Sequence, residues 1–189
     1  MALRGTLTIL REERPEDLPF LVDLRNDLET QAWSKTLPPD YTLGMYTKRL
    51  ESREFSYQRD EGRFIIVEQE SGALIGSVVY SGLDHRWDVT IGIMIAKKFW
   101  GGGYAVDALE TLLKFLFEEL GVRVVRLWTH SGNPRAIGSA EKLGFSLSYR
   151  QRESIFKNGQ LFDNVGMDML REEYYARHPE LTEHLPPLV

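Results

Sequence analysis

The feature that most limits how this chain can fold is a glycine cluster, Lys98-Phe99-Trp100-Gly101-Gly102-Gly103-Tyr104-Ala105. The preceding run, Thr90 to Ala96, is apolar and rich in isoleucine, as expected of a buried strand. The segment that follows carries apolar residues at helical spacing, namely Leu109, Leu112, Leu113, Leu116, Phe117 and Leu120. A strand, a glycine turn and a long helix therefore follow one another.

Glycines at the entry to a helix leave backbone N–H groups unshielded, and the helix dipole adds partial positive charge there. The cluster therefore predicts a phosphate or pyrophosphate site, with a simple tight turn as the alternative. A Walker loop needs Gly-Lys-Ser/Thr where Gly103-Tyr104-Ala105 stands. A dinucleotide-binding fingerprint needs a small residue where Val106 stands. Neither nucleotide motif fits.

A second segment, Asn133 to Phe145, predicts a short and well-capped helix. Asn133 suits the N-cap, Pro134 suits the first helical position, and Gly144 suits a left-handed C′ position. The segment follows the glycine cluster by one expected strand, Arg123 to Thr129. Alone, this segment indicates only a well-built helix, and it becomes informative because it follows the glycine cluster in this order.

In this order, the motifs resemble those of the GNAT superfamily of acetyl-CoA-dependent N-acetyltransferases. The run Phe99 to Ala105 is similar to that family's coenzyme A loop, and Asn133 with Lys142-Leu143-Gly144-Phe145 is similar to its next motif. The later residues Phe156-Lys157-Asn158-Gly159, Asp163 and Met167 to Leu170 resemble the branch that acetylates ribosomal-protein N-termini, and the related polyamine acetyltransferases. The resemblance extends from about Leu7 to Tyr175.

The resemblance implies an α/β fold of one domain over residues 1–175, with a C-terminal tail over 176–189. A central mixed, mostly antiparallel sheet flanked by helices is expected, and the pattern of the chain predicts the order β-α-α-β-β-β-α-β-α-β-β. The implied activity is direct transfer of the acetyl group of acetyl-CoA to a primary amine, first of all a protein N-terminal α-amine. A polyamine or aminoglycoside acceptor is the alternative, and a non-catalytic acyl-CoA-binding module is the alternative of another class.

The resemblance also implies which residues hold the coenzyme. The strand Ile93 to Ile95 would bind the pantetheine arm through its backbone, and the Met94 N–H (or that of Ile95) would stabilise the oxyanion. The full implied set is Ile93, Met94, Ile95, Lys98, Trp100, Gly101, Gly102, Gly103, Tyr104, Ala105, Asn133 and Lys142.

The acid and base of the reaction are less well marked, because this chain departs from its relatives twice. Ala140 stands where many relatives carry a tyrosine that protonates the thiolate, and Thr90 stands where some carry a glutamate. Asp88, two residues earlier on the same strand face, is the candidate base. Weaker candidates are Ser139, His85, His130 and Ser131. Water can also protonate the leaving group, because a thiol has a pKa of about 8.5.

The acceptor is the least defined part of the site. Asp23, Asp27 and Glu29 lie close in sequence, and Asp84 and Asp88 flank Trp87. With Trp33, these groups could receive a cationic amine by ion pairing and cation–π contact. A solvated acidic face is the alternative.

Composition excludes several other classes. The 189 residues carry a net charge of −5, which argues against nucleic acid as the main partner. The chain has no cysteine, so disulfides, thiolate metal sites and an acetyl-cysteine intermediate are excluded, and no metal is expected. No signal peptide or membrane span is visible, which predicts a cytoplasmic protein. A homodimer is also considered.

Overall fold

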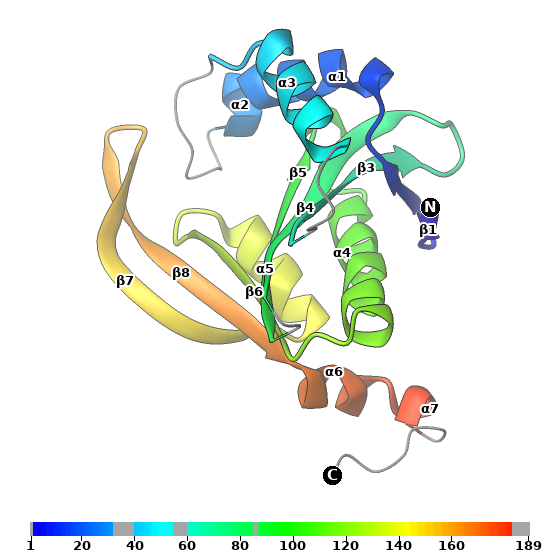
Figure 1. The fold of residues 1–189 in the computed structure, drawn as a ribbon. Helices are drawn as coiled ribbons and strands as arrows, with labels where there is room; N and C mark the ends of the chain where they lie inside the picture. The colour runs from blue at the N-terminus through cyan, green and yellow to red at the C-terminus, as the bar shows by residue number, and fades with distance from the viewer. Residues whose placement is uncertain (1, 32–39, 55–59, 85–86, 183–189) are drawn as a thin grey trace.

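Helices cover both faces of a single mixed sheet (Figure 1). The computed structural model describes residues 2–31, 40–54, 60–84 and 87–182. The strands in this part of the chain are β1 (Ala2–Arg4), β2 (Thr8–Glu12), β3 (Gly62–Glu68), β4 (Leu74–Asp84), β5 (Asp88–Ile95), β6 (Val124–His130), β7 (Ser146–Lys157) and β8 (Gln160–Leu170). The helices are α1 (Leu18–Asn26), α2 (Leu28–Gln31), α3 (Leu43–Glu54), α4 (Tyr104–Lys114), α5 (Pro134–Leu143), α6 (Arg171–Arg177) and α7 (Pro179–Thr182).

The strand order is β1-β2-β3-β4-β5-β6-β8-β7, and the only parallel pair among the described strands is β5–β6. All the other neighbours are antiparallel. The mixed, mostly antiparallel sheet that we expected is therefore confirmed.

Alternation along the strands divides the interior into two layers. Phe64 and Ile66 of β3 pack on the α4 face, in the main core with Leu112 and Leu116. Ile65, between them, packs on the opposite face with residues of α1 and α3, namely Leu18, Leu21 and Tyr46. One face of the sheet thus carries α4 and α5, and the other carries α1 and α3.

The apolar stripe that predicted a long helix is buried as expected. Leu109, Leu112, Leu113, Leu116 and Phe117 are all nearly inaccessible to solvent. The helix α4 continues into a π-helical turn, η3 (Phe115–Glu119), before β6 begins. This stripe fixes α4 against the sheet directly after the glycine cluster.

The segment from Pro15 to Leu28 does not form the single helix that we expected. It starts with a 3₁₀ turn, η1 (Pro15–Asp17), and breaks between α1 and α2. The strand β1 was not expected from the sequence, while the expected helix over Thr42 to Gln58 is described up to Glu54. Its last residues lie outside the described residues.

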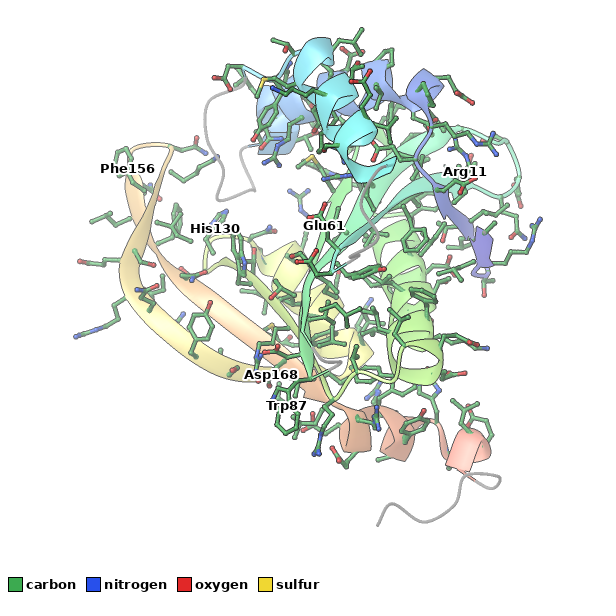
Figure 2. The ribbon with its side chains drawn as sticks, in the orientation of Figure 1. Arg11, Glu61, Trp87, His130, Phe156 and Asp168 are labelled. Atoms are coloured by element: carbon green, nitrogen blue, oxygen red, sulfur yellow. The ribbon has the colours of Figure 1, made fainter. Side chains whose placement is uncertain are left out.

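The hairpin of β7 and β8 forms a long arm that projects from the body of the molecule (Figure 1). Its turn residues Asn158 and Gly159 have φ values of 50° and 76°, as the Asn-Gly signal predicts. The Phe156 side chain lies exposed near the tip of the arm (Figure 2).

At the C-terminal end, the helices α6 and α7 extend the described structure to Thr182. Tyr174 of α6 stacks on Phe117 with ring centroids 4.7 Å apart, which fixes α6 against the end of the α4 layer. The division of the chain near residue 175 and the homodimer stay predictions. Among the described residues, none of the helices combines the length and the apolar character needed to cross a bilayer.

Candidate active site

A cavity runs through the sheet where β5 and β6 separate. The two strands pair only from Asp88 to Thr90 with Val124 to Arg126, and they diverge beyond that point (Figure 1). The opening belongs to a cavity of about 720 Å³ with residues from both faces of the sheet in its walls. The split therefore joins the α4–α5 layer to the α1–α3 layer.

Each side of the sheet contributes its own half of the cavity wall. The α4–α5 half is formed by Trp100, Ala105, Leu109, Asn133, Arg135, Ala136 and Ser139. The α1–α3 half is formed by Leu21, Leu24, Arg25, Thr30, Tyr41, Met45, Tyr46, Arg49, Arg63, Ser77, Val79, Ser81 and Thr90. The residues of the split itself, which lie between the halves, are Ile91, Gly92, Ile93, Met94, Ile95, Leu127, Trp128 and Thr129.

Along β5, the direction of the backbone groups decides which of them face the split. The Ala96 N–H donates to the Ile75 carbonyl at 2.9 Å, toward β4. Because successive residues of a strand direct their N–H and C=O groups to alternate sides, Met94 also faces β4 whereas Ile93 and Ile95 face the split. The Ile95 carbonyl accepts a hydrogen bond of 2.8 Å from Trp100 Nε1, on the side away from β4.

This alternation corrects our assignment of the Met94 amide as the oxyanion donor. The Met94 N–H belongs to the β4–β5 ladder, so it cannot also point into the opening. The Met94 side chain lies on the α1–α3 face instead, where Gln31 Nε2 donates to Met94 Sδ at 3.6 Å. The N–H groups of Ile93 and Ile95 are the ones available to a ligand in the split.

The glycine cluster forms the turn that we expected between β5 and α4. Gly101 and Gly103 have φ values of 83° and 82°, in the left-handed region that side chains rarely adopt. Gly103 is the N-cap of α4, so the first N–H groups of the helix lie directly behind the turn. This arrangement fits the pyrophosphate of the coenzyme that the resemblance implies.

Two side chains of α4 tie its first turn to the strands beside it. The Asp107 carboxylate accepts hydrogen bonds from the N–H groups of Thr6 and Thr8, at 2.8 and 2.9 Å. The Tyr104 hydroxyl donates to the Glu68 carboxylate, which Ser71 also contacts. Hydrogen bonds from Ser71 and Tyr104 hold the pKa of Glu68 below its usual value. The turn is thus anchored to β2 and β3.

Across the α4–α5 half, Arg135 stacks on Trp100. The guanidinium carbon lies 4.0 Å from the centre of the Trp100 ring. Trp100 follows β5 and Arg135 is in the first turn of α5, so the stack connects the two walls of the split. The sequence predicted Trp100 as a coenzyme contact, but gave no signal for Arg135.

Asn133 caps α5 as expected, while its contact with the coenzyme stays a prediction. Its Oδ1 accepts from the Ala136 N–H at 3.3 Å, which caps α5, and its Nδ2 donates to Thr129 Oγ1 at 3.3 Å. The residue is 9% exposed and lies in the cavity wall. Gly144 ends the helix with a φ of 95°, as predicted.

Seven expected site residues are not in the cavity wall: Gly101, Gly102, Gly103 and Tyr104, which belong to the turn, and Asp88, Lys98 and Lys142. The Asp88 carboxylate forms an ion pair with Arg126 at the closed end of the split. The Lys98 ammonium lies over the Phe99 ring at 4.9 Å, and the Lys142 carbonyl accepts from Arg177 Nη2 at 3.0 Å. The geometry therefore does not support Asp88 as a base that touches the acceptor.

The positions where relatives carry an acid or a base are filled differently. Ala140 is 1% exposed and packs in the core, while its neighbour Ser139 lies in the cavity wall, as does Thr90. His130 is buried with its ring 5.1 Å from that of Phe162 (Figure 2). Ser131 is bound to β8, since its Oγ accepts from the Asp163 N–H at 3.1 Å.

Among the described residues, the acidic groups that we expected around the acceptor do not gather at the cavity. Trp87 is exposed at the end of the molecule near α6, where Arg123 lies over its ring (Figure 2). Glu29 pairs with Lys97 at 2.7 Å, and Asp27 hydrogen-bonds to Thr30 at the start of α2. None of these groups is in the cavity wall. Trp33, His85 and the Asp84 side chain lie outside what the structure describes.

Among the described residues, the charged side chains in the cavity wall are those of arginines. Arg25 of α1, Arg49 of α3 and Arg63 of β3 are all in the wall of the α1–α3 half. They lie far apart in the sequence and follow no recognisable motif. Only the register of the sheet and the packing of α1 and α3 bring them together.

Comparison with known proteins agrees with this geometry. Residues 8–146 match the model of the acetyltransferase (GNAT) domain family. The SPbeta prophage-derived uncharacterized N-acetyltransferase YokL of Bacillus subtilis is 29% identical over 176 residues, which cover 92% of this chain and 96% of that protein. The spermidine N(1)-acetyltransferase of Escherichia coli is 24% identical over 173 residues, with 89% of each chain covered.

A putative ribosomal N-acetyltransferase of B. subtilis, YdaF, is 31% identical over a shorter stretch of 104 residues, 54% of this chain and 57% of that one. Among solved structures, the spermidine N-acetyltransferase of Vibrio cholerae in complex with CoA and spermine has a TM-score of 0.82 at 23% identity, covering 90% of this chain and 99% of that one. The family match, the fold and the split sheet agree: the chain belongs to the GNAT family of acetyl-CoA-dependent N-acetyltransferases.

Proposed function

We propose that the chain transfers the acetyl group of acetyl-CoA directly to the primary amine of a small molecule that enters through the α1–α3 half. The cavity through the split sheet supports this proposal most strongly, because it lets the two substrates approach one another from opposite faces. Its volume of about 720 Å³ suits a coenzyme arm and a small acceptor. Acetyl-CoA supplies an acetyl group already activated as a thioester.

The residues of the α4–α5 half hold the coenzyme. The N–H groups behind Gly103 bind the pyrophosphate, and the Ile95 backbone receives the outer part of the pantetheine arm. The arm runs inward from the turn, so Ile93 lies deeper in the split than Ile95. We assign the Ile93 N–H as the donor that polarises the thioester carbonyl, with an effect of about 10²- to 10³-fold on kcat.

The ammonium group of the acceptor must lose a proton before it attacks, and no described carboxylate lines the cavity to accept that proton. None of the cavity-lining residues in the described part of the chain is Asp, Glu or His. The guanidiniums of Arg25, Arg49 and Arg63 instead disfavour a second cation beside them, so they lower the pKa of a bound ammonium. The amine is then presented as the neutral nucleophile, and water protonates the leaving thiolate.

The names of relatives favour a small amine over a protein N-terminus. The relative named as a spermidine acetyltransferase aligns along 89% of this chain, whereas the putative ribosomal enzyme aligns along 54%. Spermidine and spermine therefore precede ribosomal N-terminal peptides, which we expected from the sequence, in an assay of acceptors.

Steady-state kinetics test the proposed reaction. Thiol release should be measured with varied acetyl-CoA at several fixed concentrations of an amine. Direct transfer gives intersecting double-reciprocal lines and no acetylated enzyme in the mass spectrum. Parallel lines with an acetyl-enzyme of about +42 Da would contradict direct transfer. Coenzyme binding without turnover on any amine would favour the non-catalytic module.

A further inference from the structure

We propose that Arg25, Arg49 and Arg63 form an anion-binding subsite, so that the preferred acceptor is a small amine that also carries a carboxylate or a phosphate. The inference rests on the proposed function, because it names the chemistry of the acceptor for the same cavity. It goes against the polyamine class that the names of relatives favour.

The register of the sheet places Arg63 on the α1–α3 face. Arg63 lies opposite Val79, Ser77 lies opposite Met94, and Ser81 lies opposite Thr90. Directly opposed residues share a face, so Arg63 points to the same side as the Ser77, Ser81 and Thr90 hydroxyls. The helices α1 and α3, which cover that side, bring Arg25 and Arg49 to the same half of the cavity.

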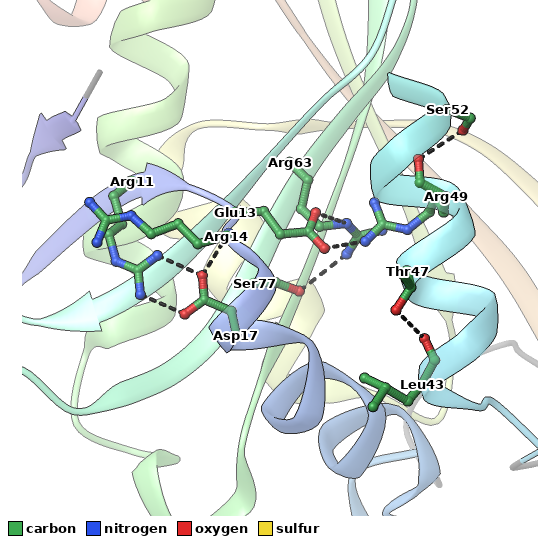
Figure 3. Close-up of polar contacts among 10 residues, drawn as sticks. All are labelled: Arg11, Glu13, Arg14, Asp17, Leu43, Thr47, Arg49, Ser52, Arg63 and Ser77. Carbon is green, nitrogen blue, oxygen red and sulfur yellow. Dashed lines mark hydrogen bonds and ion pairs between the residues drawn. The ribbon is translucent and has the colours of Figure 1, made fainter. Parts of the chain in front are cut away.

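The Glu13 carboxylate lies behind the arginines. The Glu13 side chain, only 2% exposed, bridges Arg49 and Arg63 (Figure 3). The side chains of Arg49 and Arg63 are 28% and 25% exposed, and both line the cavity whereas Glu13 does not. A ligand therefore meets the positive side of this group. Glu61, one residue before β3, is exposed and is also not in the wall.

Among the described residues, the wall of the α1–α3 half presents three guanidiniums and no acidic side chain. Charges act strongly in a cavity partly shielded from water, so this half repels a polycation and attracts an anion.

Neighbouring groups hold the guanidiniums in place. Arg25 lies over the Tyr41 ring and Arg49 over the Tyr46 ring, each 4.9 Å from the ring centre. Arg63 Nη1 donates to Ser77 Oγ at 3.4 Å (Figure 3). Guanidiniums fixed in this way are suited to planar carboxylates and to phosphates, which they bind through paired N–H donors.

Arg25 is the most suitable residue to substitute, because Arg49 and Arg63 also neutralise the buried Glu13 carboxylate. The Arg25→Gln variant removes one charge, and Arg25→Lys keeps the charge but loses the planar donors. Arg152→Gln, on the exposed strand β7, removes the same charge away from the cavity and is the matched control. Thermal unfolding of each variant verifies that it is folded.

The acceptors should be compared in pairs that differ only in the anion. Glycylglycine against glycylglycine amide tests a carboxylate, O-phosphoethanolamine against ethanolamine tests a phosphate, and spermidine represents the polycations. We expect the anionic member of at least one pair to have a kcat/KM about 10-fold or more above its neutral partner. In Arg25→Gln the ratio of kcat/KM for the anionic member to that for its neutral partner should fall about 10-fold, through the KM of the anionic member. Arg152→Gln should keep the ratio of the parent.

Binding of anions gives a second measurement that does not depend on turnover. With CoA bound, calorimetry of glutarate and of inorganic phosphate should show binding of at least one of them that weakens about 10-fold in Arg25→Gln. A preference for spermidine, or anion binding that Arg25→Gln leaves unchanged, would overturn the subsite and leave amine acetylation standing. Absence of transfer to every amine, together with retained anion binding, would instead count against the proposed reaction.

Discussion

The two halves of the cavity are built by different means: the α4–α5 half presents mainly backbone groups, and the α1–α3 half presents side chains. The first half has glycines with positive φ, a helix N-terminus and the edge of β5 that no described strand pairs with beyond Thr90. In the second, three arginines rest on two tyrosine rings and a buried glutamate. Backbone sites suit a substrate that is always the same, whereas side chains can change with the acceptor without altering the fold.

Replacing the Ile93 amide by an ester is the strongest test of whether the α4–α5 half acts through its backbone. The substitution of α-hydroxyisoleucine at position 93 removes one N–H and leaves the side chains unchanged. We expect kcat to fall about 10²- to 10³-fold, because the thioester loses its donor. The α-hydroxy analogue of methionine at position 94 is the control, since that N–H faces β4. Equal losses at both positions would reject the assignment of Ile93.

A side chain at Gly103 tests the turn. We expect Gly103→Val to weaken acetyl-CoA binding about 10- to 100-fold, because a β-branched residue is strained at a φ of 82° and narrows the approach to the helix. Calorimetry with acetyl-CoA measures the affinity. Gly72→Val is the matched control: Gly72 has a φ of 73° in the β3–β4 hairpin, with no atom within 4 Å of an added Cβ. This variant should lose stability but keep its affinity for acetyl-CoA.

A smaller effect is expected at Asn133, where a side chain serves the α4–α5 half. Asn133→Ser retains an oxygen that can cap α5, but it is too short to reach a ligand in the split. The melting temperature should stay near that of the parent while the KM for acetyl-CoA rises about fivefold, the effect of one hydrogen bond. Asn133→Ala should lower both stability, by about 1 kcal/mol, and apparent affinity. If the serine variant changes only the melting temperature, Asn133 is purely structural.

The smallest effect is expected from low pH, and it concerns Asp17, the residue directly before α1. Burial raises the pKa of Asp17, but the hydrogen bonds from Arg11 and from the Arg14 N–H outweigh it, so the folded-state pKa lies below the ordinary value of 3.8 (Figure 3). The resulting stability is fully present above pH 3.8 and is lost as the pH falls through the lower, folded-state value. Asp17→Asn should therefore lower the melting temperature at pH 7 more than at pH 3. A constant difference would show that the carboxylate charge is not what stabilises η1.

The contrast between the halves also explains what the sequence could predict. Gly103, Asn133 and the stripe from Leu109 to Phe117 are local signals, since a turn, a cap or a helix face depends on neighbours in the chain. Such signals were sufficient for the fold and for much of the α4–α5 half. The peptide direction at Met94 depends on strand register, which local patterns do not show, and so the sequence assigned the donor to an N–H that faces β4.

In the described part of the α1–α3 half, arginines line the cavity, whereas the sequence predicted carboxylates for the acceptor. Asp27 and Glu29 are near one another in sequence, but their carboxylates bind Thr30 and Lys97 outside the cavity. Arg25, Arg49 and Arg63 come from three elements that meet only after α1 and α3 pack on the sheet. The charge of a site assembled in this way is a property of tertiary structure.

The separation of β5 from β6 has a consequence for the stability of the protein. Beyond Thr90, β5 lacks a neighbouring strand on one side, so the ladder of the sheet is incomplete there. The amides of a pantetheine arm can hydrogen-bond to this edge of β5 in place of a neighbouring strand. Any ligand that binds only the folded chain stabilises it by mass action, by about 2.7 kcal/mol at 100 times its dissociation constant. The unfolding temperature of this protein should therefore follow the concentration of its coenzyme, so that the acetyl donor is also part of the folded sheet.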